Sequence, residues 1–443
     1  MPWRDFASDP SGDWLTPANA DNYAEFVSIA SKAAKSGHSD SPETIFKLYS
    51  RGIATSRDEI VYDYRQDELR PRVQAFIEEY NGELDRYKRS GNKASVDDFV
   101  NYNKIKWSRD LKLDLRRGNY ASFIEARIRR SLYRPFCHRW LFFDRILNEE
   151  VYVNPRIFPT AESELENRVI VTSDIAYRSM FPSVLVSKQI VDLHLCASDS
   201  HQCFPFYVYD EDGTNRRENI TDWALEHFRA HYADKKITKW DIFHYVYGLL
   251  HQPEYRAKYA ENLKRELPRI PLAPSRRDGG ATSDAFRAFA KAGKELARLH
   301  IEYETLKPYP LKFVVAGDEG KSGPLAHARG SVRGNQTPGV PLSYRVESKM
   351  CLSKDKTALA VNDSLTLSGI PAEAFEYRLG NRSALEWVID QYQYYEDKKS
   401  GIVSDPNRDF NDGGDPEYIV RLVGQVIQVS LDTTRIVKSL PPL

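Results

Sequence analysis

Cysteine is scarce in this 443-residue chain, which contains four: Cys137, Cys196, Cys203 and Cys351. So few cysteines do not form the dense disulfide framework of a small secreted protein, and a reduced, cytoplasmic protein is expected. The chain also has no apolar run of about 18 or more residues, so no membrane-spanning helix is expected. The first residues, MPWRDFASDPSGDW, do not show the basic and then apolar pattern of a secretory signal peptide.

An excess of charge of one sign is also missing, because 63 Lys and Arg residues balance 63 Asp and Glu residues. This balance excludes a uniformly basic surface but not local basic patches, and it is local patches that determine nucleic-acid binding. Hydrophobic residues at 41% and aromatic residues at 12% are sufficient for sizeable cores. The length and composition therefore predict a soluble protein of two or three domains.

None of the strong catalytic motifs is present. The sequence lacks a Gly-x-Ser-x-Gly elbow, a His-Glu-x-x-His zinc motif, a Gly-x-Gly-x-x-Gly loop and the Asp/Asn-Pro-Pro-Tyr/Phe loop of adenine N6-methyltransferases. Gly320-Lys321-Ser322 is similar to the end of a Walker A loop, but Val315 stands where the first glycine is required. A surface loop is expected there, and no catalytic residue is expected in this chain.

Two weaker patterns contain residue types that bind metals. HLCASDSHQC, residues 194–203, offers two His and two Cys as zinc ligands, but its Ser and Asp residues favour a turn between half-buried strands. Asp390, Glu396 and Lys398 resemble the Asp and Glu-x-Lys set of metal-dependent nucleases. That chemistry requires strands that converge on one metal, whereas a helix and its end are predicted here. No metal site is therefore expected.

Periodicity and composition divide the chain into four parts, which together predict an α+β fold. Residues 1–42 are rich in Ser, Asp, Pro and Gly and are expected to be a loose leading segment. Residues 43–136 are mainly helical. Residues 137–272 start with β-branched and aromatic runs that predict a mainly β segment, followed by helices. Residues 273–443 are mixed α/β, with a Gly- and Pro-rich flexible loop at 317–341.

Three local patterns give sharper predictions. GIATSRDEIVYDY, residues 52–64, predicts a strand, a turn at Thr55-Ser56-Arg57-Asp58 and a second strand. SFIEARIRRSLYRPF, residues 122–136, predicts a helix that ends at Pro135. IFHYVYGLLHQPEYRAKYAENLKRELPRIPL, residues 242–272, predicts helices broken at Pro253, with most tyrosines packed in the core and basic residues on the outer side.

A local basic cluster lies within residues 104–139, where eleven Lys and Arg stand against the three acids Asp110, Asp114 and Glu125. The local excess is eight positive charges, with tyrosines and tryptophans between them. Such a surface can neutralise DNA phosphates and so supply affinity that is independent of base sequence. A solvated helix face is the equally weighted alternative. The eleven residues are Lys104, Lys106, Arg109, Lys112, Arg116, Arg117, Arg127, Arg129, Arg130, Arg134 and Arg139.

Longer motifs resemble the C-terminal part of type ISP restriction–modification enzymes, which are single-chain relatives of type I systems. The resemblance spans about residues 41–440. It is carried by LYSRGIATSRDEIVYDY, ENITDWALEHFRAHY, KITKWDIFHYVYGLLHQPEYRAKYAENLKRELPRIPL, LARLHIEYETLKPYPL and SALEWVIDQYQYYEDKKSGIVSDPN. Enzymes of this family carry a nuclease, a helicase-like ATPase, an adenine N6-methyltransferase and, last, a target recognition domain. This chain matches only the end, and the loop at 317–341 interrupts the family pattern as an insertion.

The resemblance implies a module that recognises a specific double-stranded DNA site and directs methylation and cleavage by other domains. Residues 43–136 would be a helical coupling region, and residues 137–272 and 273–443 the two parts of the target recognition region. A methyltransferase, helicase or nuclease polypeptide is an expected partner. S-adenosylmethionine, ATP and Mg²⁺ are expected to serve only the missing domains, and no cofactor is expected in this chain.

The expected DNA contacts combine base-edge readout in the major groove with phosphate contacts that set register. The candidate residues are Arg51, Thr55, Ser56, Arg57, Arg127, Arg129, Arg130, Arg178 and Lys188. Two other functions remain open at this point. One is a stand-alone metal-dependent nuclease that uses Asp390, Glu396 and Lys398, and the other is a protein-interaction subunit that docks on a separate methyltransferase.

Overall fold

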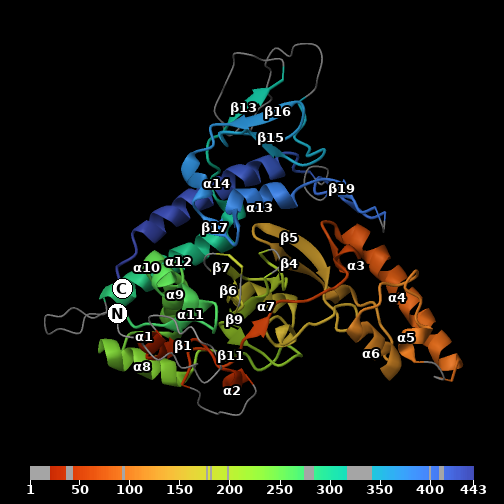
Figure 1. The fold of residues 1–443 in the computed structure, drawn as a ribbon, viewed down its shortest axis with the longest axis horizontal. Coiled ribbons are helices and arrows are strands. Elements are labelled where there is room, and N and C mark those ends of the chain that lie inside the picture. Colours follow the sequence, from red (N-terminus) through yellow and green to blue (C-terminus); the bar gives the residue numbers. More distant parts are fainter. Residues whose placement is uncertain are drawn as a thin grey trace, which may run out of the picture.

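The computed structural model has an α+β fold, as the sequence predicts. Helices lie at both sides of a central β region, and a third group of strands and helices lies above it (Figure 1). The leading residues 1–19 and 36–42 and the loop at 317–341 fall outside the part described. The structure describes residues 20–35, 43–91, 95–175, 178–179, 182–196, 199–273, 284–316, 342–398, 401–408 and 414–443.

Two four-stranded sheets form the central region. The first has the order β2 (Ser50–Arg51), β9 (His201–Pro205), β6 (Val169–Ser173), β7 (Val184–Ser187), and all its neighbours are antiparallel. The second has the order β3 (Tyr62–Asp63), β5 (Cys137–Phe142), β4 (Ile128–Arg134), β8 (Ile190–Val191). The sequence does not predict β2 and β4, which come from the part expected to be mainly helical, whereas β3 falls in the second strand predicted within residues 52–64.

The two sheets are joined by segments that serve both. Strand β8 follows β7 after two residues, and Ile53, just after β2, pairs in parallel with Asp192, just after β8. The backbones approach so closely there that a Cβ on Gly52 would lie 2.6 Å from the Asp192 carbonyl oxygen. Glycine at position 52 therefore permits the two segments to meet.

A helical arm lies on the right of Figure 1. It consists of α3 (Asp58–Val61), α4 (Gln66–Arg89), α5 (Val96–Phe99) and α6 (Arg109–Arg117). Helix α4 lies in the part predicted to be helical, and its apolar residues Val73, Phe76, Ile77 and Tyr80, spaced i, i+3, i+4 and i+7, are all buried. The Ser95 hydroxyl caps α5 by accepting from the N–H of Asp98.

The helix predicted for residues 122–136 is wrong. After the 3₁₀ turn Glu125–Arg127 the chain forms strand β4, which pairs with β5 across a turn at Pro135-Phe136. Phe136 has φ of 57°, in the left-handed region. Both faces of β4 are largely buried, so its side chains do not alternate between apolar and polar types. The sequence therefore lacks the pattern by which a half-exposed strand is recognised.

Helices α8 (Asp222–Tyr232), α9 (Lys239–Leu249), α10 (Pro253–Lys258), α11 (Ala260–Leu263) and α12 (Asp284–Ile301) lie on the left of Figure 1. The tyrosines of residues 242–272 pack in their core, as predicted. Tyr245 and Tyr255 are buried and donate to the carbonyls of Pro271 at 2.7 Å and Arg269 at 2.6 Å. Tyr247 is buried against His300, with its hydroxyl 2.6 Å from Nδ1.

Residues 20–35 also belong to this body, so the expectation of a loose leading segment is wrong for them. They form α1 (Ala20–Ala24), β1 (Val27–Ser28) and α2 (Lys32–Lys35), and β1 pairs with β12 (Arg269–Ile270). Tyr23 and Ile29 are fully buried, which explains why the segment is held.

The C-terminal part contains a sheet of order β13 (Lys312–Val315), β16 (Leu365–Ser368), β15 (Ala358–Ala360), β14 (Cys351–Leu352) and the helices α13 (Ala384–Gln391) and α14 (Tyr418–Lys438). Small elements complete the described fold. They are α7 (Ala161–Glu166), β10 (Tyr207–Val208), β11 (Arg217–Glu218), β17 (Arg378–Leu379), β18 (Arg382–Ser383), β19 (Tyr395–Glu396), β20 (Val403–Ser404) and the 3₁₀ turns Asn154–Arg156, Tyr303–Thr305 and Ala372–Phe375.

Helix α14 connects the molecule's two hydrophobic cores. Its first turns, with Ile419 and Leu422, pack in the core that holds α4 and the central sheets, whereas Ile436 packs in the core of α8 to α12. A buried polar bridge reinforces this connection, because Nε2 of His300 on α12 lies 2.9 Å from the Thr433 hydroxyl on α14. None of the helices in the described segments is long and apolar enough to cross a membrane.

The first prediction concerns the crossing of α9 and α12. A Cβ on Gly293 would lie 1.8 Å from the His244 carbonyl oxygen and 2.8 Å from the Gly248 nitrogen, so Gly293→Ala forces the two helices apart. We expect it to lower the free energy of unfolding by about 1–3 kcal/mol or more, measured by urea denaturation. Gly82→Ala, at an exposed position of α4, is the control, because its Cβ would meet nothing within 4 Å, and it should stabilise the protein by roughly 0.5–1 kcal/mol. Equal midpoints for Gly293→Ala and the native chain would contradict this account of the crossing.

The second prediction concerns acid stability. Burial lowers the pKa of both His201 and His251 to about 4, and that of His300 well below its ordinary value. Between about pH 6.5 and pH 4 the unfolded chain therefore binds protons that the folded chain does not, so stability falls as pH falls through this range. Each such histidine contributes up to about 1.4 kcal/mol per pH unit.

Burial raises the pKa of Glu164 to about 7, so this group acts in the opposite direction. The test is therefore the change in the pH dependence of stability that one substitution causes. His251→Gln removes one titrating group, and we expect the unfolding free energy to depend less steeply on pH between 6.5 and 4. Urea denaturation at several pH values measures the slope. An unchanged slope in His251→Gln would show that this histidine is not held neutral.

Candidate nucleic-acid interface

The basic cluster at residues 104–139 is largely neutralised in three dimensions. Seven of its eleven cations form ion pairs with carboxylates of the described residues, and nearly all these carboxylates lie outside the cluster in sequence. The pairs are Lys104 with Glu79, Lys106 with Glu59, Arg109 with Asp110 and Glu150, Lys112 with Asp97, Arg127 with Asp144, Arg129 with Glu164, and Arg134 with Asp192. A solvated helix face, the alternative interpretation, does not describe the whole cluster either, because Arg129 and Arg139 are buried on strands β4 and β5.

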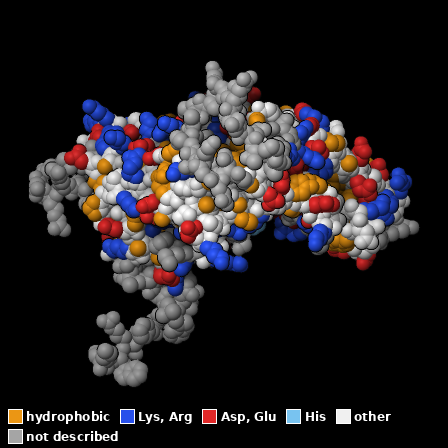
Figure 2. All heavy atoms as spheres, turned by 90° about the horizontal axis from the view of Figure 1, so that it is seen from above, with side chains coloured by type: hydrophobic (Ala, Val, Ile, Leu, Met, Phe, Trp, Pro, Cys, Tyr) orange, Lys and Arg blue, Asp and Glu red, His pale blue; other side chains and the backbone are white. Residues whose placement is uncertain are grey.

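The wider surface has the same mixed character. On the face shown in Figure 2, Lys and Arg side chains are interspersed with Asp and Glu side chains. A DNA interface on such a surface depends on a few well-placed cations rather than on a strong overall field.

Three predicted contact residues are buried, and the structure corrects their assignment. Arg57 is fully buried, and donates from Nη1 to the Leu147 carbonyl at 2.5 Å and from Nη2 to the Ser108 hydroxyl at 2.6 Å. Arg129 is 5% exposed and donates from Nε to Glu164 at 2.8 Å. Thr55 is buried and donates to the Asp58 carboxylate. These side chains hold the fold together, and none of them is available to DNA.

Ser56 lies between the buried Thr55 and Arg57 and is exposed. Its φ of 57° places it in the left-handed region, at the tip of a tight turn. The segment differs from the predicted strand, turn and strand, because Asp58 starts helix α3 before β3 begins. The Asp58 carboxylate accepts from the Tyr133 hydroxyl at 2.9 Å, so the turn is fixed to the central sheet.

Arg127 and Arg130 have partners within the fold, and neither side chain lies fully in the open. Arg127 on the 3₁₀ turn pairs with Asp144, and its side chain is 38% exposed. The Arg130 guanidinium on β4 lies 5.0 Å from the centre of the Trp140 ring. Both are held more firmly than free surface cations, which lowers their value as independent DNA contacts.

Arg178 and Lys188 are exposed, as expected for phosphate contacts. Neither forms an ion pair with a residue that the structure describes. The backbone N–H of Arg178 donates to Asp199 at 3.0 Å, which fixes the main chain and leaves the guanidinium outside. Lys188 stands in the short turn between β7 and β8.

Arg51, at the edge of the first sheet, has a different environment. Its Nε and Nη2 donate to the same oxygen of Asp174, Oδ2, at 3.1 and 2.8 Å. The Arg51 side chain is 45% exposed, whereas that of Asp174 is 7% exposed. The carboxylate is therefore inside the protein, and the guanidinium that it holds is at the surface.

Asp174 is itself firmly held. Its Oδ2 accepts from the Ser200 hydroxyl at 3.2 Å, and its Oδ1 from the Ile175 N–H at 2.9 Å. Burial alone would raise its pKa, but hydrogen bonds from Gln202, Ile175 and Arg51 hold the pKa below its usual range. Sequence analysis missed Asp174 because 123 positions separate it from Arg51. Its place at the end of the apolar run RVIVTS is a weak signal.

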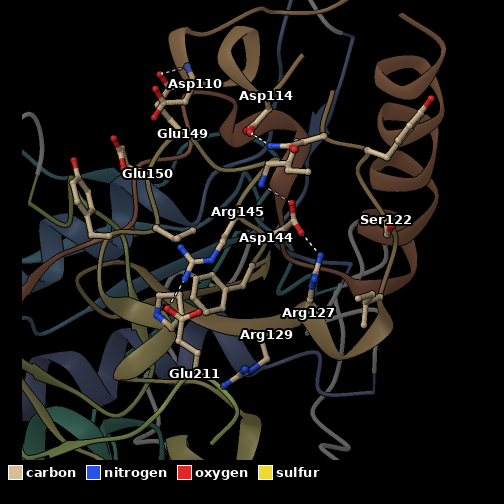
Figure 3. A pocket seen from close by; sticks show the side chains of 18 of the residues that line it. Asp110, Asp114, Ser122, Arg127, Arg129, Asp144, Arg145, Glu149, Glu150 and Glu211 are labelled. Carbon is tan, nitrogen blue, oxygen red and sulfur yellow. Dashed lines mark hydrogen bonds and ion pairs between the residues drawn. The ribbon is translucent and has the colours of Figure 1, made fainter. Parts of the chain in front are cut away.

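A cleft of about 990 Å³ opens between α6 and the segment after β5 (Figure 3). Its charged lining has more acids than bases, namely Asp110, Asp114, Asp144, Glu149, Glu150 and Glu211 against Arg117, Arg127, Arg129 and Arg145. Of the bases, Arg145 pairs with Glu211 at 2.7 Å and Arg127 with Asp144. Burial raises the pKa of Asp114, and burial followed by the charge of Asp110 raises that of Glu150. A cleft with this charge repels phosphates and does not suit a DNA backbone.

The residues considered for metal chemistry have other roles. His201 and Cys203 lie buried on β9, and Asp390 on α13 pairs with Lys349 at 2.9 Å and Arg382 at 3.2 Å. Glu396 lies exposed on β19. Among the residues of the described ranges, no three His, Cys, Asp or Glu side chains lie close enough together to hold a metal ion.

Comparison with solved structures places the whole chain beside DNA-bound enzymes. A nuclease-deletion mutant of the type ISP restriction–modification enzyme LlaGI, in complex with a DNA substrate mimic, is 29% identical with a TM-score of 0.77, over 100% of this chain and 36% of that one. The DrdV–DNA complex is 34% identical with a TM-score of 0.78, over 100% of this chain and 40% of that one. The ATP-dependent type ISP enzyme LlaBIII bound to DNA is 26% identical with a TM-score of 0.79, over 99% of this chain and 25% of that one.

The chain thus spans two fifths or less of the length of these three proteins. No curated protein matches it. A family model described as the type ISP C-terminal specificity domain matches residues 44–422, which is more than half of the sequence. The chain therefore belongs to the family of type ISP C-terminal specificity domains.

Proposed function

We propose that this chain recognises a specific site in double-stranded DNA, as the specificity part of a type ISP restriction–modification system. The observation that carries the proposal is the family match over residues 44–422, together with DNA-bound relatives whose structures superpose on essentially the whole chain. Methylation and cleavage at the recognised site would be carried out by other domains, in the same longer protein or in a partner polypeptide.

The surface cations give the proposal a physical basis. Arg51, Arg178 and Lys188 expose their charged groups on the central β region, and Ser56 presents a hydroxyl on a fixed turn nearby in sequence. Phosphate contacts from Arg178 and Lys188 would set the position of the protein on the duplex. Base specificity then requires at least one side chain with fixed donor geometry in a groove.

Two further parts of the proposal concern where the cofactors of the system bind and where in the cell the protein works. We propose that S-adenosylmethionine, ATP and Mg²⁺ serve the domains outside this chain, in keeping with the order of domains in the enzymes that it resembles. We also propose that the protein works in the cytoplasm. The four cysteines are free thiols, and burial raises the pKa of the Cys196 and Cys203 thiols to about 12, which keeps them protonated.

The experiment that tests the proposed function is a selection. The purified 443-residue chain would be incubated with a pool of random duplex DNA at about 50 mM and about 200 mM salt, and bound sequences determined. We expect enrichment of one short site that persists at the higher salt, because base contacts do not depend on counterion release. Binding without enrichment that is lost at the higher salt would contradict the proposal and favour a subunit that docks on a methyltransferase.

A further prediction concerns the phosphate contacts. Arg178→Ala and Lys188→Ala should each weaken binding to every sequence by a similar factor, and reduce the slope of log affinity against log salt by about 0.9. Filter binding or fluorescence anisotropy across a salt series measures both quantities. Lys438→Ala on α14 is the control, because this side chain is 65% exposed and pairs with Glu376, away from the central sheets. If Arg178→Ala and Lys438→Ala give the same slope as the native chain, Arg178 does not contact phosphate.

A further inference from the structure

We propose that Arg51 reads a guanine of the recognised site and that Asp174 is the positioning residue that aims it. The inference rests on the proposed function, which it deepens by naming a specificity-determining residue. Its starting observation is a surface guanidinium held by a buried carboxylate at the edge of the first sheet (Arg51 and Asp174).

The free edge of the guanidinium suits a guanine. Arginine has five N–H donors in a rigid plane, and Asp174 takes two of them from the Nε and Nη2 side. Three donors remain on Nη1 and Nη2, and a hydrogen bond with the Tyr152 phenol leaves two of them for another acceptor pair. In the major groove, O6 and N7 of guanine present such a pair, and the bidentate arginine–guanine contact is the commonest specific contact.

The backbone beneath Arg51 is equally fixed. Arg51 pairs with Gln202 of β9, and its carbonyl accepts from the Asn154 side chain at 2.9 Å. The next N–H, of Gly52, donates to the His201 carbonyl at 3.2 Å. The backbone of Arg51 is held by β9 and Asn154, and its guanidinium is held by a buried carboxylate. The side chain therefore loses little conformational entropy when it binds a base.

Other half-exposed arginines also pair with buried carboxylates, but their surroundings differ. Arg127 lies in the acidic cleft, which repels DNA. The Arg86 guanidinium lies 3.7 Å from the centre of the Phe99 ring and donates to the Phe99 carbonyl. Arg345 shares Asp405 with Arg408. Among the described residues, the Arg51 guanidinium interacts with Asp174, the Tyr152 phenol and Tyr49.

The pairing with Asp174 predicts an unusual signature. Because the carboxylate offsets the charge of Arg51, this arginine adds little attraction for phosphates, and its contribution is directional hydrogen bonding. Loss of Arg51 should therefore affect base preference more than affinity for unrelated DNA. Loss of the Asp174 charge should instead raise the affinity for DNA of any sequence. The preference for guanine should still fall, because the arginine is no longer held in position.

The test uses the site enriched by the 443-residue chain and duplexes with each single-base replacement. The native chain should prefer guanine at one position by roughly 5- to 150-fold. Arg51→Ala and Arg51→Lys should lose this preference at that position only. Arg216→Ala, which removes an arginine of similar exposure (49%) paired with the exposed Glu166, should keep it. Asp174→Asn should show reduced preference with equal or tighter binding to unrelated DNA.

A change in the DNA tests the same contact without altering the protein. Replacement of that guanine by 7-deazaguanine removes the N7 acceptor, and should weaken binding by the native chain but not by Arg51→Ala. Thermal unfolding of every variant identifies loss of folding, and the 7-deazaguanine result for the native chain does not depend on any variant.

The outcomes separate the two proposals. If the native chain enriches no site, the proposed function fails and this inference fails with it. If the native chain enriches a site but Arg51→Ala and Arg51→Lys retain every base preference, only the assignment of Arg51 is overturned. Insensitivity of the native chain to 7-deazaguanine at all guanines of the site overturns it as well.

Discussion

The pairing of buried arginines with carboxylates from distant parts of the sequence is the interaction on which the central region depends. Arg134 on β4 reaches Asp192 after β8 at 2.8 Å, and Arg129 on the same strand reaches Glu164 on α7. A buried charge is costly without a partner, and removal of one partner leaves the other uncompensated. These pairs therefore fix which segments meet, and with them the edge of the first sheet at which Arg51 is presented.

The sequence predicts an element well where one face of it is exposed. The apolar period of α4 indicates a helix because its other face carries polar residues, whereas α9, which contains Tyr245, is buried on nearly all sides. Strand β4 was missed because both of its faces are buried and its arginines are paired inside the protein. The partners of those arginines are far away in sequence, so the charges of residues 122–136 suggested an exposed helix.

The same limit applies to the candidate site. Sequence analysis identified Arg51, Arg178 and Lys188, which are exposed, but also Arg57 and Arg129, which are buried. Nothing local distinguishes the two kinds of arginine. The difference is whether the fold places a carboxylate or carbonyl from another segment where it can accept hydrogen bonds from the guanidinium. Asp174 could not be found for this reason, since its role exists only once β2, β6 and β9 lie side by side.

The position of α14 has a consequence for how this protein is made. Both hydrophobic cores include side chains of this helix, from Ile419 in one to Ile436 in the other. During synthesis on the ribosome, neither core can close completely until α14 has left the exit tunnel. The earlier segments must wait with apolar surface uncovered, where chaperones can bind them. The emergence of α14 is thus the step that commits the two cores described here to their native structure.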